Sequence, residues 1–170
     1  MSRSRLDVDD LLDLLNGAPG RIADLAAGCT PDQLRCRPAP DDWSANDVLA
    51  HLRACADVWG GRMELIVAED HPTIRAINPT TWILQTDYPD LAFAESLAAF
   101  TSQRKTLLPF LRSLTPAQWE RTCRLVGAGA PLEHSVHGYA DALARHERTH
   151  IKQIQRTLKM VATPNQTRSS

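Results

Sequence analysis

The chain has 170 residues, 43% of them hydrophobic, and its 19 basic residues nearly balance its 20 acidic ones. This length and apolar content suit one domain with a real core, and the charge balance removes any general electrostatic case for binding nucleic acid or an anionic membrane. No apolar run approaches the roughly 20 residues of a membrane span, and the charged start has no apolar signal segment, so we expect a soluble, cytoplasmic protein.

The first half of the chain reads as helices. A Leu- and Ala-rich helix is predicted from about Val8 to Ala27, with a kink or break at Pro19, and a short capped turn follows at residues 30–33. Ser44 begins the clearest helix, with Asp47 completing a weak capping box. Its apolar residues recur in steps of three and four, as on a helix that faces a bundle: Leu49, Leu52, Ala56, Trp59, Met63 and Ile66.

The second half continues with helices joined by polar connections. A crossing loop is predicted over residues 73–89, with one helical turn near Trp82. A third long helix follows over 90–114, bent or interrupted at Pro109, and a short helical turn over 115–119. A flexible connection over 126–131 then leads to the last helix, from Ser135 to about Met160. No strand is predicted. Four long helices predict an all-α four-helix bundle as a single domain over residues 1–162, with a polar, disordered tail over 163–170.

The last predicted helix carries His146 and His150, with Glu147 beside the first. Positions four residues apart lie about 40° apart around a helix, so both imidazoles can hold one metal ion. They lie in the middle of the apolar stripe rather than on the wet face, and polar rings directed at a core need partners. A metal ion is the partner that would explain both rings at once.

A third imidazole is expected from His51, one turn into the helix that begins at Ser44. It lies at the flank of the apolar seam and would face a groove between helices, where bundles build metal sites. Three neutral imidazoles leave at least one coordination position open, which is a catalytic rather than a structural pattern. The other histidines, His71, His134 and His137, are expected to be plain solvent-exposed residues.

Other polar side chains share these inward faces. Arg104 lies on an apolar face of the third long helix, where it could anchor a substrate anion or form a structural ion pair with Glu147 or Asp47. The sequence leaves both interpretations open. Tyr139 and Gln153 lie within a turn or two of the histidine pair and could support the metal ligands.

Cysteines carry little signal in this chain. Cys29, Cys36, Cys55 and Cys123 show no C-x-x-C spacing and are expected to be small buried residues rather than disulfides. Cys55 follows His51 by one turn and could be a ligand or a reactive thiol, although an inert cysteine is the more common case.

The run from His146 to His150 is also the zincin protease signature, in which Glu147 would be a general base. Zincins need a third ligand downstream, but residues 151–170 contain no His, Asp or Glu. No strand is predicted that could bind a peptide edge-on. A peptidase is therefore not favoured.

Taken together, the motifs resemble the DinB-like superfamily, from about residue 11 to residue 158. The matching residues are Trp43-Ser44, Val48 to Leu52, Arg62, Phe100-x-x-x-Arg104, Trp119 with Arg121, and His146-Glu147-x-x-His150-x-x-Gln153-Ile154. The resemblance implies a DinB/YfiT-like bundle, up-down-down-up with a long crossover. It also implies a divalent ion, zinc or nickel, bound by His51, His146 and His150.

The resemblance says less about the reaction. Characterised members include S-transferases of bacillithiol, mycothiol or glutathione and a mycothiol-dependent isomerase, while many others are described only as metal-dependent hydrolases. The resemblance favours transfer of a low-molecular-weight thiol to an electrophilic small molecule. In that reaction Glu147 would take the proton if it faces the cavity, and Arg104 would hold an anionic end of the thiol or acceptor.

Two alternatives stay open. One is a hydrolase that uses metal-activated water with Glu147 as base. The other is a non-catalytic, metal-binding stress-response bundle. A two-fold homodimer is compatible with the chain, but the sequence does not establish one.

Overall fold

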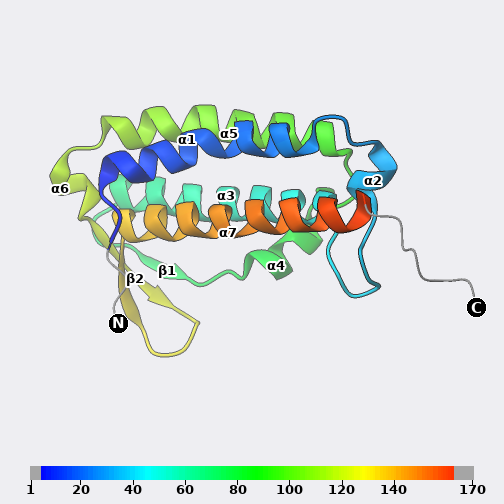
Figure 1. The fold of residues 1–170 in the computed structure, drawn as a ribbon. Helices are drawn as coiled ribbons and strands as arrows, with labels where there is room; N and C mark the ends of the chain where they lie inside the picture. Colours follow the sequence, from blue (N-terminus) through cyan, green and yellow to red (C-terminus); the bar gives the residue numbers. More distant parts are fainter. Residues whose placement is uncertain (1–4, 163–170) are drawn as a thin grey trace, which may run out of the picture.

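Four long helices form a bundle in the computed structural model, which describes residues 5–162 (Figure 1). They are α1 (Val8–Ala26), α3 (Ala45–Ala68), α5 (Phe93–Ser113) and α7 (Val136–Ala162). Helices α1 and α7 run in one direction and α3 and α5 in the other. Around the bundle, α3 packs against α5 and α7, and α1 also packs against α5 and α7. The predicted up-down-down-up bundle is confirmed. The predicted disordered tail, 163–170, lies outside the described residues.

Side-chain caps fix where the two site-bearing helices begin. Ser44 Oγ accepts the backbone N–H of Asp47 at 3.1 Å, and the Asp47 carboxylate accepts the backbone N–H of Ser44 at 2.9 Å, so the capping box is complete. At the start of α7, Ser135 Oγ accepts the backbone N–H of Gly138 at 3.0 Å. Both starts agree with the sequence prediction.

Two prolines lie inside helices without ending them. Pro19 is a buried residue of α1, and Pro109 lies in the last turns of α5. Each removes one backbone donor, but the apolar faces of both helices are packed in the core and outweigh that loss. An interruption at either proline is therefore excluded, while the alternative of a kink or bend there stays a prediction.

The bundle interior contains two clusters of buried apolar side chains. One includes Met63, Leu111 and Leu143, and the other includes Leu49, Phe100 and Ile154. Along α3 and α7, the predicted metal ligands lie between residues of the two clusters.

A small three-stranded sheet was not predicted from the sequence. Strand β1 (Thr73–Arg75) pairs in parallel with β2 (Thr122–Val126), which pairs antiparallel with β3 (Leu132–Ser135). Strands this short show no alternation long enough to recognise, and β1 meets a partner far away in the chain. The β2–β3 turn uses Gly127 and Gly129 at φ +87° and +95°, where a side chain would be strained.

A long crossover connects the parallel helices α3 and α5. It contains β1, the short helix α4 (Pro79–Trp82) and the 3-10 turn η1 (Ile83–Gln85), in agreement with the predicted turn near Trp82. Tyr88 holds the crossover down, because its hydroxyl donates to Asp57 at 2.7 Å and its ring lies 3.7 Å from the Arg53 guanidinium. The other short helices are α2 (Pro31–Arg35) and α6 (Pro116–Trp119).

The four cysteines, all within the described residues, are free thiols, as predicted. Cys55 and Cys123 are buried, but Cys36 is exposed, so the expectation of general burial is wrong. None of the helices in residues 5–162 has the length and apolar character needed to cross a membrane.

Candidate metal centre

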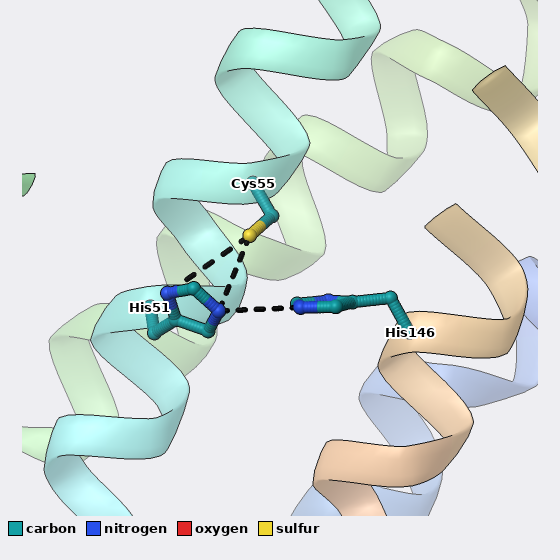
Figure 2. Close-up of side chains that lie close together, drawn as sticks. All are labelled: His51, Cys55 and His146. Carbon is teal, nitrogen blue, oxygen red and sulfur yellow. Dashed lines mark hydrogen bonds between the residues drawn. The ribbon is translucent and has the colours of Figure 1, made fainter. Parts of the chain in front are cut away.

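Three imidazoles meet between α3 and α7. His51 of α3 and His146 of α7 face each other with their Nε2 atoms 3.2 Å apart (Figure 2). One turn further along α7, His150 places its Nε2 atom 3.1 Å from that of His146 and its ring centre 4.9 Å from that of His51. The structure therefore brings together all three histidines predicted to share one ion.

The nitrogen separations suit ligation of a single metal ion. Zinc–nitrogen bonds of about 2.0–2.1 Å place two ligand nitrogens about 2.9 Å apart at a right angle and about 3.3 Å apart at the tetrahedral angle. Both observed Nε2 separations fall between these limits. These two separations, both measured from His146 Nε2, are therefore compatible with a shared ion.

The hydrogen bonds also point the lone pairs inward. His150 Nδ1 lies 2.7 Å from the Oε1 acceptor of Gln153, so a neutral His150 carries its proton on Nδ1 and turns an unprotonated Nε2 toward His146. His146 Nδ1 is buried with no hydrogen-bond partner in the part of the chain that the structure describes. One N–H at His146 Nε2 could serve only one of its two neighbours, whereas a cation accepts electrons from all three nitrogens.

Burial keeps these imidazoles neutral. Burial, and secondly the charge of His150, lowers the pKa of His51 to about 4. Burial, followed by the charges of His150 and His51, lowers the pKa of His146 to about 3. Burial also lowers the pKa of His150, against the opposing hydrogen bond to Gln153. At neutral pH the three rings are in the form that binds a metal ion.

Two tryptophan rings pack against the three histidines. Trp43 lies edge-on to His51 with ring centres 5.1 Å apart and stacks against His150 at 6.2 Å. Trp59 lies edge-on to His146 at 5.1 Å. A pocket of about 240 Å³ shares Trp43 and Gln153 with the cluster, so a small molecule has room beside it.

Cys55 is a fourth donor that the sequence analysis did not favour. Its Sγ lies 3.5 Å from Nε2 of His51, and the donor atoms of His51, Cys55 and His146 all lie within 4.8 Å of one another (Figure 2). The spacing of four residues from His51 is the signal that points to this position. Burial, and secondly the charge of Glu147, raises the pKa of the thiol to about 12.

Two donor sets therefore share His51 and His146, one completed by His150 and the other by Cys55. In the histidine set, the Nε2 atoms of His51 and His150 both lie close to Nε2 of His146, at 3.2 and 3.1 Å. We take the three histidines as the primary set.

Arg104 and Glu147 form an ion pair in the middle of the bundle. Arg104 Nη2 donates to Glu147 Oε1, and the two side chains are 3% and 2% exposed. Burial raises the pKa of Glu147 to about 7, against the lowering effect of Arg104. The sequence left two roles open for Arg104, a structural ion pair or the binding of a substrate anion. The structure shows the ion pair with Glu147. Direct catalytic roles for the two residues stay predictions.

The remaining histidines lie elsewhere. His71 is exposed and contacts Glu133 at 2.7 Å, as expected of a surface residue. His137 is 3% exposed and accepts from Arg5 Nε at 2.6 Å, so the expectation of exposure is wrong there. His134 is half-buried against Tyr139, with ring centres 4.2 Å apart. Tyr139, expected beside the metal ligands, contacts His134 and also accepts from Arg62 Nη1 at 3.4 Å.

The fold and this cluster together define a four-helix bundle with a candidate metal centre between its second and last long helices. The sequence model of the DinB superfamily matches residues 14–154, and the chain belongs to this family. The family and fold expected from the sequence are both confirmed.

The chain is similar to two proteins whose names refer to metal-dependent hydrolases. A protein of Geobacillus kaustophilus (strain HTA426) named "Putative metal-dependent hydrolase GK0616" is 24% identical over 148 residues, which are 87% of this chain and 82% of that protein. YfiT from Bacillus subtilis, described as a probable metal-dependent hydrolase with an unusual four-helix bundle topology, has a TM-score of 0.78 at 21% identity. That match covers 93% of this chain and 89% of YfiT.

Proposed function

We propose that the protein is a divalent-metal-dependent enzyme that transfers a low-molecular-weight thiol to an electrophilic small molecule. The observation that carries the proposal is the convergence of three neutral imidazole nitrogens, His51 and His146 at 3.2 Å and His146 and His150 at 3.1 Å. An ion such as zinc or nickel, held by neutral ligands, would keep its full charge and stabilise a thiol as the nucleophilic thiolate. The names of both relatives support dependence on a metal.

Neighbouring residues would support this chemistry without touching the substrate sulfur. Gln153 accepts the Nδ1 proton of His150 at 2.7 Å, which fixes the orientation of that ring. Trp43 and Trp59 cover the imidazoles and limit the access of water. The pocket beside Trp43 would admit the thiol or its acceptor.

The surroundings of Glu147 favour a thiol over water as the nucleophile. Hydrolysis needs a general base that can reach the attacking water. Glu147 is 1% exposed and engaged by Arg104, and the described donor cluster contains no other carboxylate. An ion lowers the pKa of bound water from about 15.7 to about 7, but a thiol starts from an ordinary pKa of about 8.5 and would lose its proton on the ion more readily. Direct roles for Glu147 as proton acceptor and Arg104 as anion anchor would require their ion pair to open.

Hydrolysis is the second candidate, because the Geobacillus relative and YfiT are both described as metal-dependent hydrolases. In that case water takes the place of the thiol, and Glu147 acts as base after separating from Arg104. The non-catalytic bundle is the remaining alternative, in which the histidine cluster only stabilises the fold.

One assay separates these three functions. Protein reconstituted with zinc or nickel is incubated with bacillithiol, mycothiol or glutathione and an aryl halide acceptor, and separately with a nitrophenyl ester without thiol. We expect consumption of the aryl halide that requires both thiol and metal. His146→Ala should lose this activity, whereas His134→Ala, a matched variant outside the cluster, should keep it.

The other outcomes are equally informative. Ester cleavage that needs the metal but no thiol, without thiol transfer, would replace the transferase by a hydrolase. Absence of both reactions in fully metal-loaded protein would favour the structural site.

A further inference from the structure

We infer that Cys55 is a fourth ligand of this centre in its resting state and that the substrate thiol takes its position during turnover. The inference rests on the proposed function, because it concerns the same ion. It adds a ligand that the three-histidine description lacks.

The placement of the donors supports four ligands rather than three. Helix α3 presents His51 and Cys55 at positions i and i+4, and α7 presents His146 and His150 with the same spacing. Each pair lies on one face of its helix, and the two helices pack against each other. Figure 2 shows Cys55 directed toward the ring of His51 on the same helix, and His51 facing His146 of α7. Around a bound ion, two matched pairs on facing helices would form a cage of three nitrogens and one sulfur.

The distances agree with a shared ion. A zinc–sulfur bond of about 2.3 Å and a zinc–nitrogen bond of about 2.0–2.1 Å at the tetrahedral angle place sulfur and nitrogen about 3.5 Å apart. Cys55 Sγ lies 3.5 Å from Nε2 of His51. Its separation from the donor atom of His146 is within 4.8 Å, so a modest movement of the side chain would complete the cage.

The environment of Cys55 supplies no competing partner. Its side chain is 0% exposed, and among the described residues its hydrogen-bond contacts run to His51 alone. Mixed cysteine and histidine sets are common for zinc. The thiol therefore lies where a ligand is needed, and among the described residues its only polar contacts are with His51.

Exchange of one thiol for another fits the proposed reaction. When Cys55 binds, its sulfur–hydrogen bond breaks and the proton leaves to solvent. When the substrate thiol binds in its place, the substrate sulfur–hydrogen bond breaks and one forms again at Cys55 Sγ. The charge of the centre is unchanged by this exchange, whereas replacing the thiolate with neutral water would alter it.

Cobalt provides a direct test, because thiolate ligation gives cobalt(II) an intense near-ultraviolet charge-transfer band and imidazole ligation does not. The full-length protein is loaded with one equivalent of cobalt(II), and its spectrum is recorded before and after adding glutathione. We expect the band in the wild-type protein before any thiol is added. Cys55→Ala should bind cobalt without the band and gain it only when glutathione is added.

Two variants control for folding and for other thiols. Cys55→Ser, which keeps nearly the same side-chain size, should also lack the band, and this agreement would exclude altered packing in Cys55→Ala as the cause. Cys123→Ala removes another fully buried cysteine, and this variant should keep the band of the wild-type protein.

Cobalt bound by the wild-type protein without a thiolate band would overturn the role of Cys55 and leave the three-histidine site intact. A band that survives in Cys55→Ala without added thiol would also overturn it. No cobalt binding at all would instead overturn the proposed function together with this inference.

Discussion

The Nε2 atoms of His51 and His146 lie 3.2 Å apart, although 95 positions separate the two residues in the chain. They meet because α3 and α7 pack side by side, with the two histidines on the faces that the helices turn toward each other. Two ring nitrogens this close can share at most one proton, and the Nε2 lone pair of His150 is directed at the same region. A cation satisfies this arrangement better than any set of protons does.

The orientation of His150 by Gln153 predicts an effect on metal affinity. Replacing Gln153 with Leu removes the acceptor 2.7 Å from His150 Nδ1 and frees the ring to change tautomer. We expect the zinc affinity to fall about 10- to 100-fold, measured by competition with a chromogenic chelator. Arg156→Ala, one turn along α7, is the matched control and should leave the affinity unchanged. An equal affinity for Gln153→Leu and wild type would show that Gln153 does not support the site.

The buried pair of Arg104 and Glu147 predicts a stability loss that depends on pH. Arg104→Met leaves Glu147 without its partner in the core, which typically costs about 3–5 kcal/mol. The folded-state pKa of Glu147 is already raised from 4.5 to about 7 and should rise further in the variant. A carboxyl group with a raised pKa destabilises the fold as pH rises, so the loss should be larger at about pH 8 than at about pH 5.

Urea unfolding of the metal-free protein measures this effect. The double variant Arg104→Met with Glu147→Met should recover most of the lost stability, because no charge is left unpaired. A loss of equal size at both pH values would mean that Glu147 is not the group responsible.

The low pKa values of the histidines predict how the zinc affinity depends on pH. His51 and His146 stay neutral until the pH approaches their values of about 4 and about 3, far below the ordinary 6.5. In Cys55→Ala, the affinity should therefore change little between about pH 8 and about pH 6, since protons do not compete for the ligands. In the wild-type protein, ligation by Cys55 releases one proton, so the affinity should rise about tenfold per pH unit.

Chelator competition across this pH range distinguishes the two proteins. A steep loss of affinity in Cys55→Ala below about pH 7 would show that the histidines titrate normally.

Much of the fold could be predicted from local patterns. The Ser44 capping box and the regular apolar seam of α3 specify that helix almost completely. The three strands could not be predicted, because β1 pairs with β2 only after the crossover brings residues 73–75 beside residues 124–126. Pairing of short, distant segments leaves little trace in either sequence. The helix interruptions expected at Pro19 and Pro109 failed because core packing outweighs the loss of a single backbone donor.

Some features of the candidate site could likewise be predicted from the sequence, and others could not. The pair His146 and His150 follows from helical spacing, and His51 follows from its position beside the apolar seam. That Arg104 contacts Glu147 could not be decided from sequence, because an inward guanidinium fits an anion or a carboxylate equally well. Cys55 was undervalued because buried cysteines are common, and only the distance to His51 distinguishes this one.

The proposed ligands predict which histidine variants lose bound zinc. His146→Ala should lose stoichiometric zinc in elemental analysis, because it removes the nitrogen that lies within 3.2 Å of both other donors. A double replacement of His134 and His137 should retain zinc, since neither belongs to the cluster. Zinc lost from the double variant and retained by His146→Ala would place the site elsewhere.

The most direct test of the central claim is an anomalous difference map at the zinc absorption edge, from crystals of the zinc-loaded protein. The account predicts one strong peak between α3 and α7, within bonding distance of the Nε2 atoms of His51, His146 and His150. A peak at another position, or none within bonding distance of all three rings, would contradict it.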